Sequence, residues 1–355
     1  MFRNFATGRT VSGSALTIGL LDYFSGWKSA DDLIRQSRIP HSTLRKAIAV
    51  LHRASILQRS GDALSPAEAR MDQWASWNPA AGFFHFSTKD VRFASKANAD
   101  RLVRERAAAR PVPEPLKRAR GRTLTRLPTG IDTGGFEEVL NRRRTWRRFG
   151  NTRISIDELA TLLRMTFGAQ RWVDLGAAGR AMLRTSPSAG ARHPLEAYVV
   201  VRHVSRLKPG IYHYRPNDHQ LAHIGEWRSR FDRYLPAQVW YRRAAALVLI
   251  TAVFARTEWK YPFPRAYRTI LLEAGHFAQT FCLTATALAL APFCTAALAD
   301  SVIEKDLGLD GVSESVIYAC GVGTRPPGVD WAPWPDTSET PQLFPPVSAK
   351  ISRKR

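Results

Sequence analysis

Two groups of arginines could bind a charged ligand. The segment 142–149 reads RRRTWRRF, and Arg325 stands in the motif GVGTRP after the last apolar stretch. Guanidinium groups donate paired hydrogen bonds in a planar fork, so together with the Thr145 hydroxyl they can surround a phosphate. A solvated basic surface has the same composition, and the sequence leaves both interpretations open.

The segment 186–196, SPSAGARHPLE, runs into an expected strand. Small residues between prolines form a rigid loop, and a flat ring can approach the backbone of such a loop closely. An ordinary tight turn would have the same residues. The loop is therefore a candidate contact for a planar ligand.

Lys260 and Tyr261 are the residues best suited to proton transfer. An unperturbed lysine or tyrosine titrates near about 10, but burial lowers the pKa of lysine and nearby cations lower that of tyrosine. Either side chain could then remove a proton from a substrate; the alternative is an exposed lysine above a packed tyrosine. Gly275 lies within the next expected helix, costs about 1 kcal/mol relative to alanine and predicts close packing there. His276 and Gln279 share a face of that helix and fit a packing or dimer surface.

Several catalytic motifs are absent from the sequence. It contains no GxGxxG after a strand, no GxxxxGK[ST], no HExxH and no GxSxG, which disfavours nicotinamide Rossmann, P-loop, zinc peptidase and serine hydrolase chemistry. The histidines of the segment 210–225 have no carboxylate cluster and are not expected to be ligands. Cys282, Cys294 and Cys320 lack metal-binding spacing, so we expect buried free thiols and no metal site.

The 355-residue chain is strongly basic, because 52 lysines and arginines against 30 aspartates and glutamates give a net charge of +22. This charge favours polyanionic partners: nucleic acid, an anionic membrane surface, an acidic peptide or a phosphate-bearing cofactor. We find no clear signal peptide and no strongly apolar run of about 20 residues. The expectation is a cytoplasmic protein without a membrane span.

The first eighty residues predict a winged helix-turn-helix. Apolar residues recur at helical spacing over 16–23, 33–34 and 44–51, and the segment 56–59, a turn at 60–62 and a return to Leu64 predict a small hairpin. Such a fold with positive charge can bind DNA, but no Arg, Asn or Gln pair is clearly placed to read base edges. Docking of a peptide, or of another part of the chain, is the favoured interpretation.

Beyond residue 136 the pattern is α+β. Strands are expected at 196–202, 210–214, 220–224, 245–254 and 315–322, and helices follow the capping boxes Ser155–Glu158 and Ser301–Glu304 and span 266–289. Strands mixed with helices without regular βαβ alternation indicate an α+β layer rather than a doubly wound sheet. Before them, basic residues at 101–126 are interrupted by prolines and predict an extended linker.

Five motifs in this order resemble one family. The start RRRTWRRF, the loop PSAG entering a strand, GIYHY, the run KY…YR…LLEAGHFAQ and the ending GVGTRP resemble the SagB-type dehydrogenases, nitroreductase-fold flavoproteins that mature ribosomal peptides. The resemblance covers roughly residues 136–328. It implies a nitroreductase-like antiparallel sheet flanked by helices, with FMN at a homodimer interface.

The resemblance also implies roles for individual residues. Either Lys260 or Tyr261, which match the Lys–Tyr pair of members that oxidise azolines, would remove a Cα proton while hydride leaves Cβ for the flavin. The FMN contacts would be Arg143, Thr145 and Arg147 at the phosphate with Arg144 beside them and Arg325 as a further candidate, Pro187, Ser188, Ala189 and Gly190 along the isoalloxazine ring, and the backbone near Ala296 at flavin N5.

These observations predict an FMN-dependent peptide dehydrogenase in four parts: a winged-helix-like adaptor at 1–95, a basic linker at 96–135, an FMN domain at 136–330 and a tail at 331–355. We expect the adaptor to bind an acidic leader of a precursor peptide. Other peptide-modifying enzymes are further expected partners, whereas nucleic acid is not. The alternatives are a reductase of dehydroamino acids or of nitro and quinone compounds that uses NAD(P)H, a DNA-binding regulator with a flavin-sensing domain, and a flavin-free scaffold.

Overall fold

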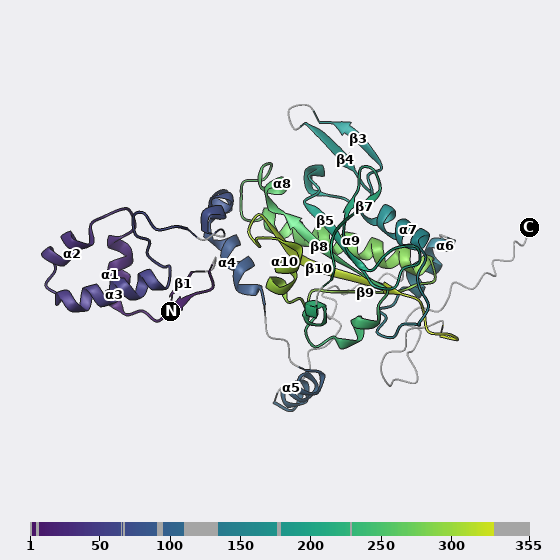
Figure 1. The fold of residues 1–355 in the computed structure, drawn as a ribbon, viewed down its shortest axis with the longest axis horizontal. Helices are drawn as coiled ribbons and strands as arrows, with labels where there is room; N and C mark the ends of the chain where they lie inside the picture. Colours follow the sequence, from purple (N-terminus) through teal and green to yellow (C-terminus); the bar gives the residue numbers. More distant parts are fainter. Residues whose placement is uncertain are drawn as a thin grey trace, which may run out of the picture.

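The computed structural model describes residues 2–4, 7–64, 66, 68–90, 95–109, 134–175, 179–227 and 229–329. Figure 1 shows a small group of helices, α1 to α3, standing apart from a larger body built around a sheet. We call residues 2–64 the N-terminal unit, and residues 68–90 with 134–329 the sheet unit. The predicted tail at 331–355 and the proline-rich part of the predicted linker lie outside the described residues.

A six-stranded antiparallel sheet forms the centre of the sheet unit, in the order β7-β6-β5-β8-β10-β9. Every residue of β5 is buried, and so is every residue of β8 except the last. The sheet is therefore covered on both faces, which confirms the predicted antiparallel sheet flanked by helices. The strands are β5 (Leu195–Val201), β6 (Gly210–Arg215), β7 (Gln220–Gly225), β8 (Ala246–Val253), β9 (Ala291–Thr295) and β10 (Glu314–Gly323).

Two helices cover one face of this sheet. The first, α7 (Ile156–Phe167), begins at the predicted capping box, in which Glu158 N donates to Ser155 Oγ at 3.0 Å and Ser155 N donates to Glu158 Oε2 at 2.6 Å. The second, α9 (Ala266–Ala287), packs beside α7 and over residues such as Val199. Side chains alternate along a strand, so Val200 faces a second core on the opposite side of the sheet.

The remaining elements of the sheet unit are short. An antiparallel pair, β3 (Arg171–Asp174) and β4 (Arg180–Leu183), projects from the body in Figure 1. Helix α6 (Gly135–Arg142) precedes the arginine-rich segment, α8 (Phe254–Glu258) follows β8, and α10 (Asp300–Leu307) precedes β10. The residue before α10 is Ala299, so the capping box predicted at Ser301 is wrong. The start of the predicted linker forms a helix, α5 (Lys96–Ala109).

The N-terminal unit has three helices around a small core. They are α1 (Ala15–Tyr23), α2 (Ala30–Gln36) and α3 (His41–Arg53), and a strand pair, β1 (Phe2–Arg3) with β2 (Thr10–Val11), lies beside them. The turn at 60–62 forms, since Asp62 N donates to Arg59 O at 3.0 Å. However, no strands flank this turn, because the Asp62 carboxylate instead accepts Arg59 N. The predicted wing is thus a turn without a hairpin, and the winged-helix assignment stays a prediction.

Residues 68–90 belong structurally to the sheet unit. They form a 3₁₀ helix (Glu68–Trp77) and α4 (Asn78–Thr88). Trp74 and Trp77 are buried in the core beneath the sheet, and their indole nitrogens donate to Val312 O at 3.1 Å and to Tyr261 O at 3.0 Å. The adaptor boundary predicted near residue 95 is therefore wrong, because the aromatic residues of this segment complete the core of the second unit.

Within the described parts of the chain, no helix is long and apolar enough to cross a membrane. The longest, α9, spans 22 residues but carries a buried glutamate, Glu273, and threonines along its length.

Candidate cofactor and active site

The arginine-rich segment is held in an extended path along the end of the sheet. Trp146 N donates to Pro292 O of β9, and Gly150 N donates to Thr324 O after β10, both at 2.8 Å. Trp146 is buried, while Arg143, Arg144 and Thr145 before it are half-buried. A Cβ at Gly150 would lie 2.6 Å from the carbonyl oxygen of Arg325, so only glycine lets the two segments approach this closely.

Trp146 brings Arg325 to the same place. The Arg325 guanidinium lies 5.3 Å from the centre of the Trp146 ring, and its Nε donates to Leu290 O at 3.2 Å. Arg144 donates to Asn141 O at 2.9 Å, and burial followed by the charge of Arg143 lowers its pKa. Arg147 is exposed and lies 5.8 Å from the Trp240 ring. Guanidinium groups thus gather where the arginine-rich segment meets β9 and β10.

Three cysteines lie beside these arginines, although they are far apart in the sequence. Cys294 of β9 is paired with Cys320 of β10, and Tyr318 Oη donates to Cys294 Sγ at 3.3 Å. Hydrogen bonds from Cys282 and Tyr318, and then the charge of Arg143, hold the pKa of the Cys294 thiol below its ordinary value. All three thiols are free, and the described residues contain no group that could hold a metal ion.

The loop at 186–194 meets the Lys–Tyr pair directly. Gly190 has a φ of +58°, and a Cβ there would lie 2.6 Å from both Lys260 Nζ and Tyr261 Oη. The Ser188 hydroxyl accepts a hydrogen bond from His193 N at 2.8 Å and closes the loop. Lys260 is exposed and Tyr261 half-buried. The structure therefore brings together Gly190, Lys260 and Tyr261, which the sequence placed seventy residues apart.

Buried charges support this loop from behind. The Glu196 carboxylate accepts from His213 at 2.8 Å and from Arg256, so His213 does have an acidic partner. His193 Nδ1 and Glu273 Oε1 face each other at 3.6 Å, and both side chains are almost completely buried. Neither atom has a hydrogen-bond partner among the described residues. No local pattern in the sequence indicates this meeting of a loop with α9.

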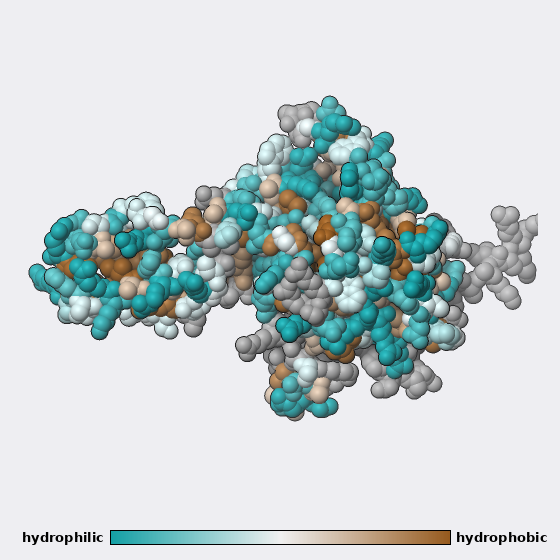
Figure 2. Space-filling model, in the orientation of Figure 1, coloured by the Kyte–Doolittle hydropathy of each residue, from teal (hydrophilic) through white to brown (hydrophobic). Residues whose placement is uncertain are grey.

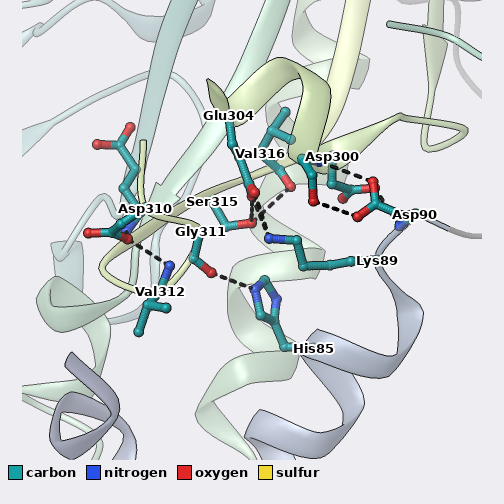
Figure 3. A network of polar contacts seen from close by, with 12 residues as sticks. His85, Lys89, Asp90, Asp300, Glu304, Asp310, Gly311, Val312, Ser315 and Val316 are labelled. Carbon is teal, nitrogen blue, oxygen red and sulfur yellow. Dashed lines mark hydrogen bonds and ion pairs between the residues drawn. The ribbon is translucent and has the colours of Figure 1, made fainter. Parts of the chain in front are cut away.

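A small cavity opens beside Ala296. Its volume is about 210 Å³, and it lies between α4, α9 and the residues around Ala296 and Asp300. Figure 3 shows how α4 is fixed there: Lys89 reaches Glu304 of α10, and His85 reaches the Gly311 carbonyl. Burial raises the pKa of Asp300 to about 6. The sequence identified Ala296 but not the acid and the helix beside it.

The predicted site residues fall into two groups at opposite ends of the sheet. Leu195, which follows the loop, is in register with Ala252 and Ser315. The arginines gather toward the other end, where Trp146 N donates to Pro292 O, in register with Val322, and where Arg325 follows Gly323. From Ser315 to Gly323 the strand advances eight residues, or about 26 Å at 3.3 Å per residue. One chain therefore does not bring the loop and the Lys–Tyr pair together with the arginines.

Comparison with known proteins decides the family. The model of the nitroreductase family matches residues 140–324. This chain belongs to the nitroreductase family. Membership makes the protein an oxidoreductase of a family that typically uses FMN.

Two curated relatives share the sheet unit. "Putative nitroreductase MJ1384" of Methanocaldococcus jannaschii is 32% identical over 174 residues, which is 48% of this chain and 83% of the relative. "Trifolitoxin-processing protein TfxB" of Rhizobium leguminosarum bv. trifolii is 30% identical over 172 residues, 47% of this chain and 46% of the relative. This chain thus spans about half the length of TfxB.

A solved structure of the Escherichia coli microcin synthetase McbBCD complex with truncated pro-MccB17 bound is 18% identical, with a TM-score of 0.40; the match covers 90% of this chain and 95% of that one.

The residues present fit FMN. Half-buried guanidinium groups and the Thr145 hydroxyl are a donor set for a phosphate. Ala296 is exposed beside an open cavity. Neither Ala296 nor Ala297 takes a left-handed backbone, so both positions hold alanine without backbone strain.

Proposed function

We propose that this protein is an FMN-dependent dehydrogenase that oxidises azoline rings in a ribosomally made precursor peptide to azoles. The observation that carries the proposal is the convergence of Lys260 Nζ and Tyr261 Oη on Gly190. Two groups able to hold a proton lie against the loop that the resemblance assigns to the flavin ring. The relative TfxB, whose name describes trifolitoxin processing, agrees with a peptide substrate.

In the proposed reaction, the chain's own residues bind the cofactor and take the proton. Arg143, Arg144, Thr145, Arg147 and Arg325 would hold the FMN phosphate. When bound, FMN supplies the acceptor for a hydride from Cβ of the azoline. Lys260 or Tyr261 would take the proton from Cα, so that two electrons and two hydrogens leave the ring and the azole remains. The absence of a side chain at Gly190 lets both candidate bases lie against the loop.

A homodimer would complete this site. Because the loop and the arginines lie at opposite ends of one sheet, a second copy is needed to bring them to the same flavin. The exposed face of α9 has the composition of an interface: Leu272 is 64% exposed, and Leu271 beside it is also exposed. Gly275 is exposed with nothing within 4 Å of a Cβ, so no contact within the described part of the chain supplies the close packing predicted there. An exposed glycine would let a helix of the second copy approach closely.

Absorption and binding measurements test the cofactor. The purified protein is expected to bind FMN, with absorption near about 450 nm, and to elute as a dimer from size-exclusion chromatography. The double variant Arg143→Ala/Arg147→Ala should lose at least about tenfold in FMN affinity, because each charge-assisted hydrogen bond contributes about 1.5–3 kcal/mol. Arg148→Ala, an exposed neighbour, is the matched control. A colourless protein that ignores added FMN would overturn the proposal.

Turnover measurements test the base. Tyr261→Phe and Lys260→Met should keep FMN, and at least one of them should slow azole formation by about 100-fold or more, the size expected for loss of a general base. Wild-type rates in both variants would remove the pair from the reaction.

The N-terminal unit would recruit the peptide through its acidic leader. A groove of about 1000 Å³ lies between α2, α3 and the segment 55–60. Figure 2 shows hydrophobic side chains between hydrophilic ones across this unit. Lys28, Arg45 and Arg59 line the groove, with Asp31 as its acidic residue. Apolar walls with basic edges suit an extended, acidic peptide with hydrophobic anchors.

Fluorescence anisotropy with a labelled acidic leader peptide tests this recruitment. Removal of residues 1–64 should abolish binding and leave residues 68–90 in the core of the sheet unit. Arg45→Glu/Arg59→Glu should weaken binding at least about tenfold, whereas Arg35→Glu, which lies outside the groove, should not. Sequence-selective binding of duplex DNA with a steep salt dependence would favour a regulator instead.

A second candidate function is reduction, in which the flavin passes electrons to the substrate instead of taking them from it. The relative MJ1384 carries the name of a nitroreductase, so reduction of nitro or quinone compounds by NAD(P)H is the competing activity. Rapid NAD(P)H consumption together with failure to oxidise any azoline peptide would favour it.

A further inference from the structure

The cavity beside Ala296 is partly formed by a segment outside the part of the chain that matches the family. Helix α4, at residues 78–88, precedes the family match at 140–324. Its residues Phe84, His85 and Thr88 line the cavity together with α9 and β10. The ion pair Lys89–Glu304, at 2.6 Å and mostly buried, fixes the end of α4 to α10, and so does Asp90, which accepts from Ser301 N at 3.1 Å. The wall made by α4 is therefore firmly attached.

The size of the cavity suits one ring rather than a nucleotide. Pockets for drug-sized ligands have volumes of about 300–1,000 Å³, and this cavity has about 210 Å³. Its floor is apolar, with Leu298 and Val316 buried, and the exposed Phe84 stands at its rim. Such a space accepts a five-membered ring on a peptide and leaves the rest of the peptide outside.

The polar groups in the walls are mostly engaged with each other. His85 Nδ1 and Tyr267 Oη are 2.8 Å apart, and His85 Nε2 lies 3.3 Å from Gly311 O. Lys89 is neutralised by Glu304. Asp300 lines the same cavity, and its Oδ2 accepts from Asp90 N at 3.2 Å. Because burial raises its pKa to about 6, this carboxyl can accept a hydrogen bond or, when protonated, donate one to a ring nitrogen.

We propose that the cavity between α4 and Ala296 is the pocket for the azoline ring of the substrate, and that Asp300 makes the polar contact with that ring. This inference rests on the proposed function and on the family resemblance, which implies that flavin N5 faces the backbone near Ala296. It assigns α4 to substrate recognition, a role that the family match does not include. The N-terminal extension would thus supply both a groove for the leader and a wall for the reacting ring.

Binding of a small, unreactive probe tests the pocket without turnover. The probe is 2-methylthiazole-4-carboxamide, the ring of the expected product, and its binding to the FMN-loaded full-length protein is followed by saturation-transfer NMR. Thr88→Trp fills the cavity and should weaken probe binding at least about tenfold, while Thr88→Ser, which keeps the space and the hydroxyl, should stay within about twofold. FMN absorbance and circular dichroism verify that each variant is folded and loaded.

Substitutions at two more positions keep the test decisive. Phe84→Ala removes an exposed rim residue and should weaken probe binding about threefold to tenfold. Asp300→Ala should weaken it further than Asp300→Asn, because the amide keeps a polar contact. Equal probe affinity in wild type, Thr88→Trp and Phe84→Ala would overturn the pocket while leaving FMN binding and peptide oxidation intact. A protein that never binds FMN would overturn both proposals.

Discussion

Lowering the pH should change the free energy of unfolding through two buried groups where α4 meets α10. Protonation at one group lowers this free energy, and protonation at the other raises it. Burial, and then the charge of Lys89, lowers the pKa of His85 from 6.5 to about 3. The folded protein therefore keeps His85 neutral while the unfolded chain takes up a proton, so its contribution to stability is lost as the pH falls below about 6.5. Burial raises the pKa of Asp300 from 3.8 to about 6. The folded protein binds that proton first, so stability is gained as the pH falls from about 6 towards 4.

The size of each effect follows from these pKa values. One pH unit changes the free energy of unfolding by about 1.4 kcal/mol for each proton that the unfolded and folded states bind differently. Between pH 7 and pH 5, His85 should lower the free energy of unfolding by about 2 kcal/mol, and Asp300 should raise it by about 1 kcal/mol. In the wild type the two effects largely cancel and leave a small net loss of stability. Replacing either residue should make the effect of the other measurable.

Urea unfolding followed by tryptophan fluorescence at pH 7 and pH 5 measures these contributions. His85→Gln should make the protein less sensitive to acid than wild type by about 2 kcal/mol, and Asp300→Asn more sensitive by about 1 kcal/mol. Differences from wild type cancel the contributions of all other groups. His41→Gln, an exposed position at the start of α3, should match wild type. The same change between pH 7 and pH 5 in all four proteins would refute the assignment of buried, shifted groups at this contact.

Three further substitutions test other parts of the structure. Gly190→Ala places a Cβ 2.6 Å from the Lys260 ammonium at a φ of +58°, and azole formation should fall by about 100-fold while FMN absorbance is retained. Trp74→Ala should lower the free energy of unfolding by about 3–5 kcal/mol, whereas Trp27→Ala, at a position that is 74% exposed, should change it by no more than about 0.5 kcal/mol; urea titrations give both values. Lys89→Met leaves the Glu304 carboxylate buried without its cation and should cost about 3–5 kcal/mol in the same assay.

The sheet could be predicted from the sequence because its signals are local. The continuous apolar runs of β5 and β8 identify buried central strands, and Ser155 with Glu158 marks the start of α7 through contacts three residues apart. The segment 68–90 could not be placed in this way. Apolar residues such as Trp74 show that a segment is buried, but they do not show which unit buries it.

The candidate site was predictable by residue type and not by arrangement. Lys260 and Gly190 have chemistry and flexibility that stand out in a sequence, but their approach depends on the fold. Ser301 and Glu304 match a capping pattern, yet Glu304 instead binds Lys89, which lies 215 residues away. No sequence pattern marks Asp300 as a candidate site residue. Its raised pKa results from burial in the folded protein, to which segments distant in the chain contribute.

If the protein oxidises a peptide as proposed, the attachment of residues 68–90 to the sheet unit would limit which positions of that peptide can react. Asn4 donates from its side chain to Ser55 O at 2.6 Å and to Glu68 Oε1 at 3.0 Å, so the groove proposed for the leader is tied to the start of a segment that is itself anchored in the core. An extended peptide spans at most about 3.3–3.6 Å per residue. A heterocycle too few residues after the leader would therefore not reach the flavin and would stay unoxidised. The distance between groove and flavin would thus set a minimum number of residues between the leader and the first oxidised ring.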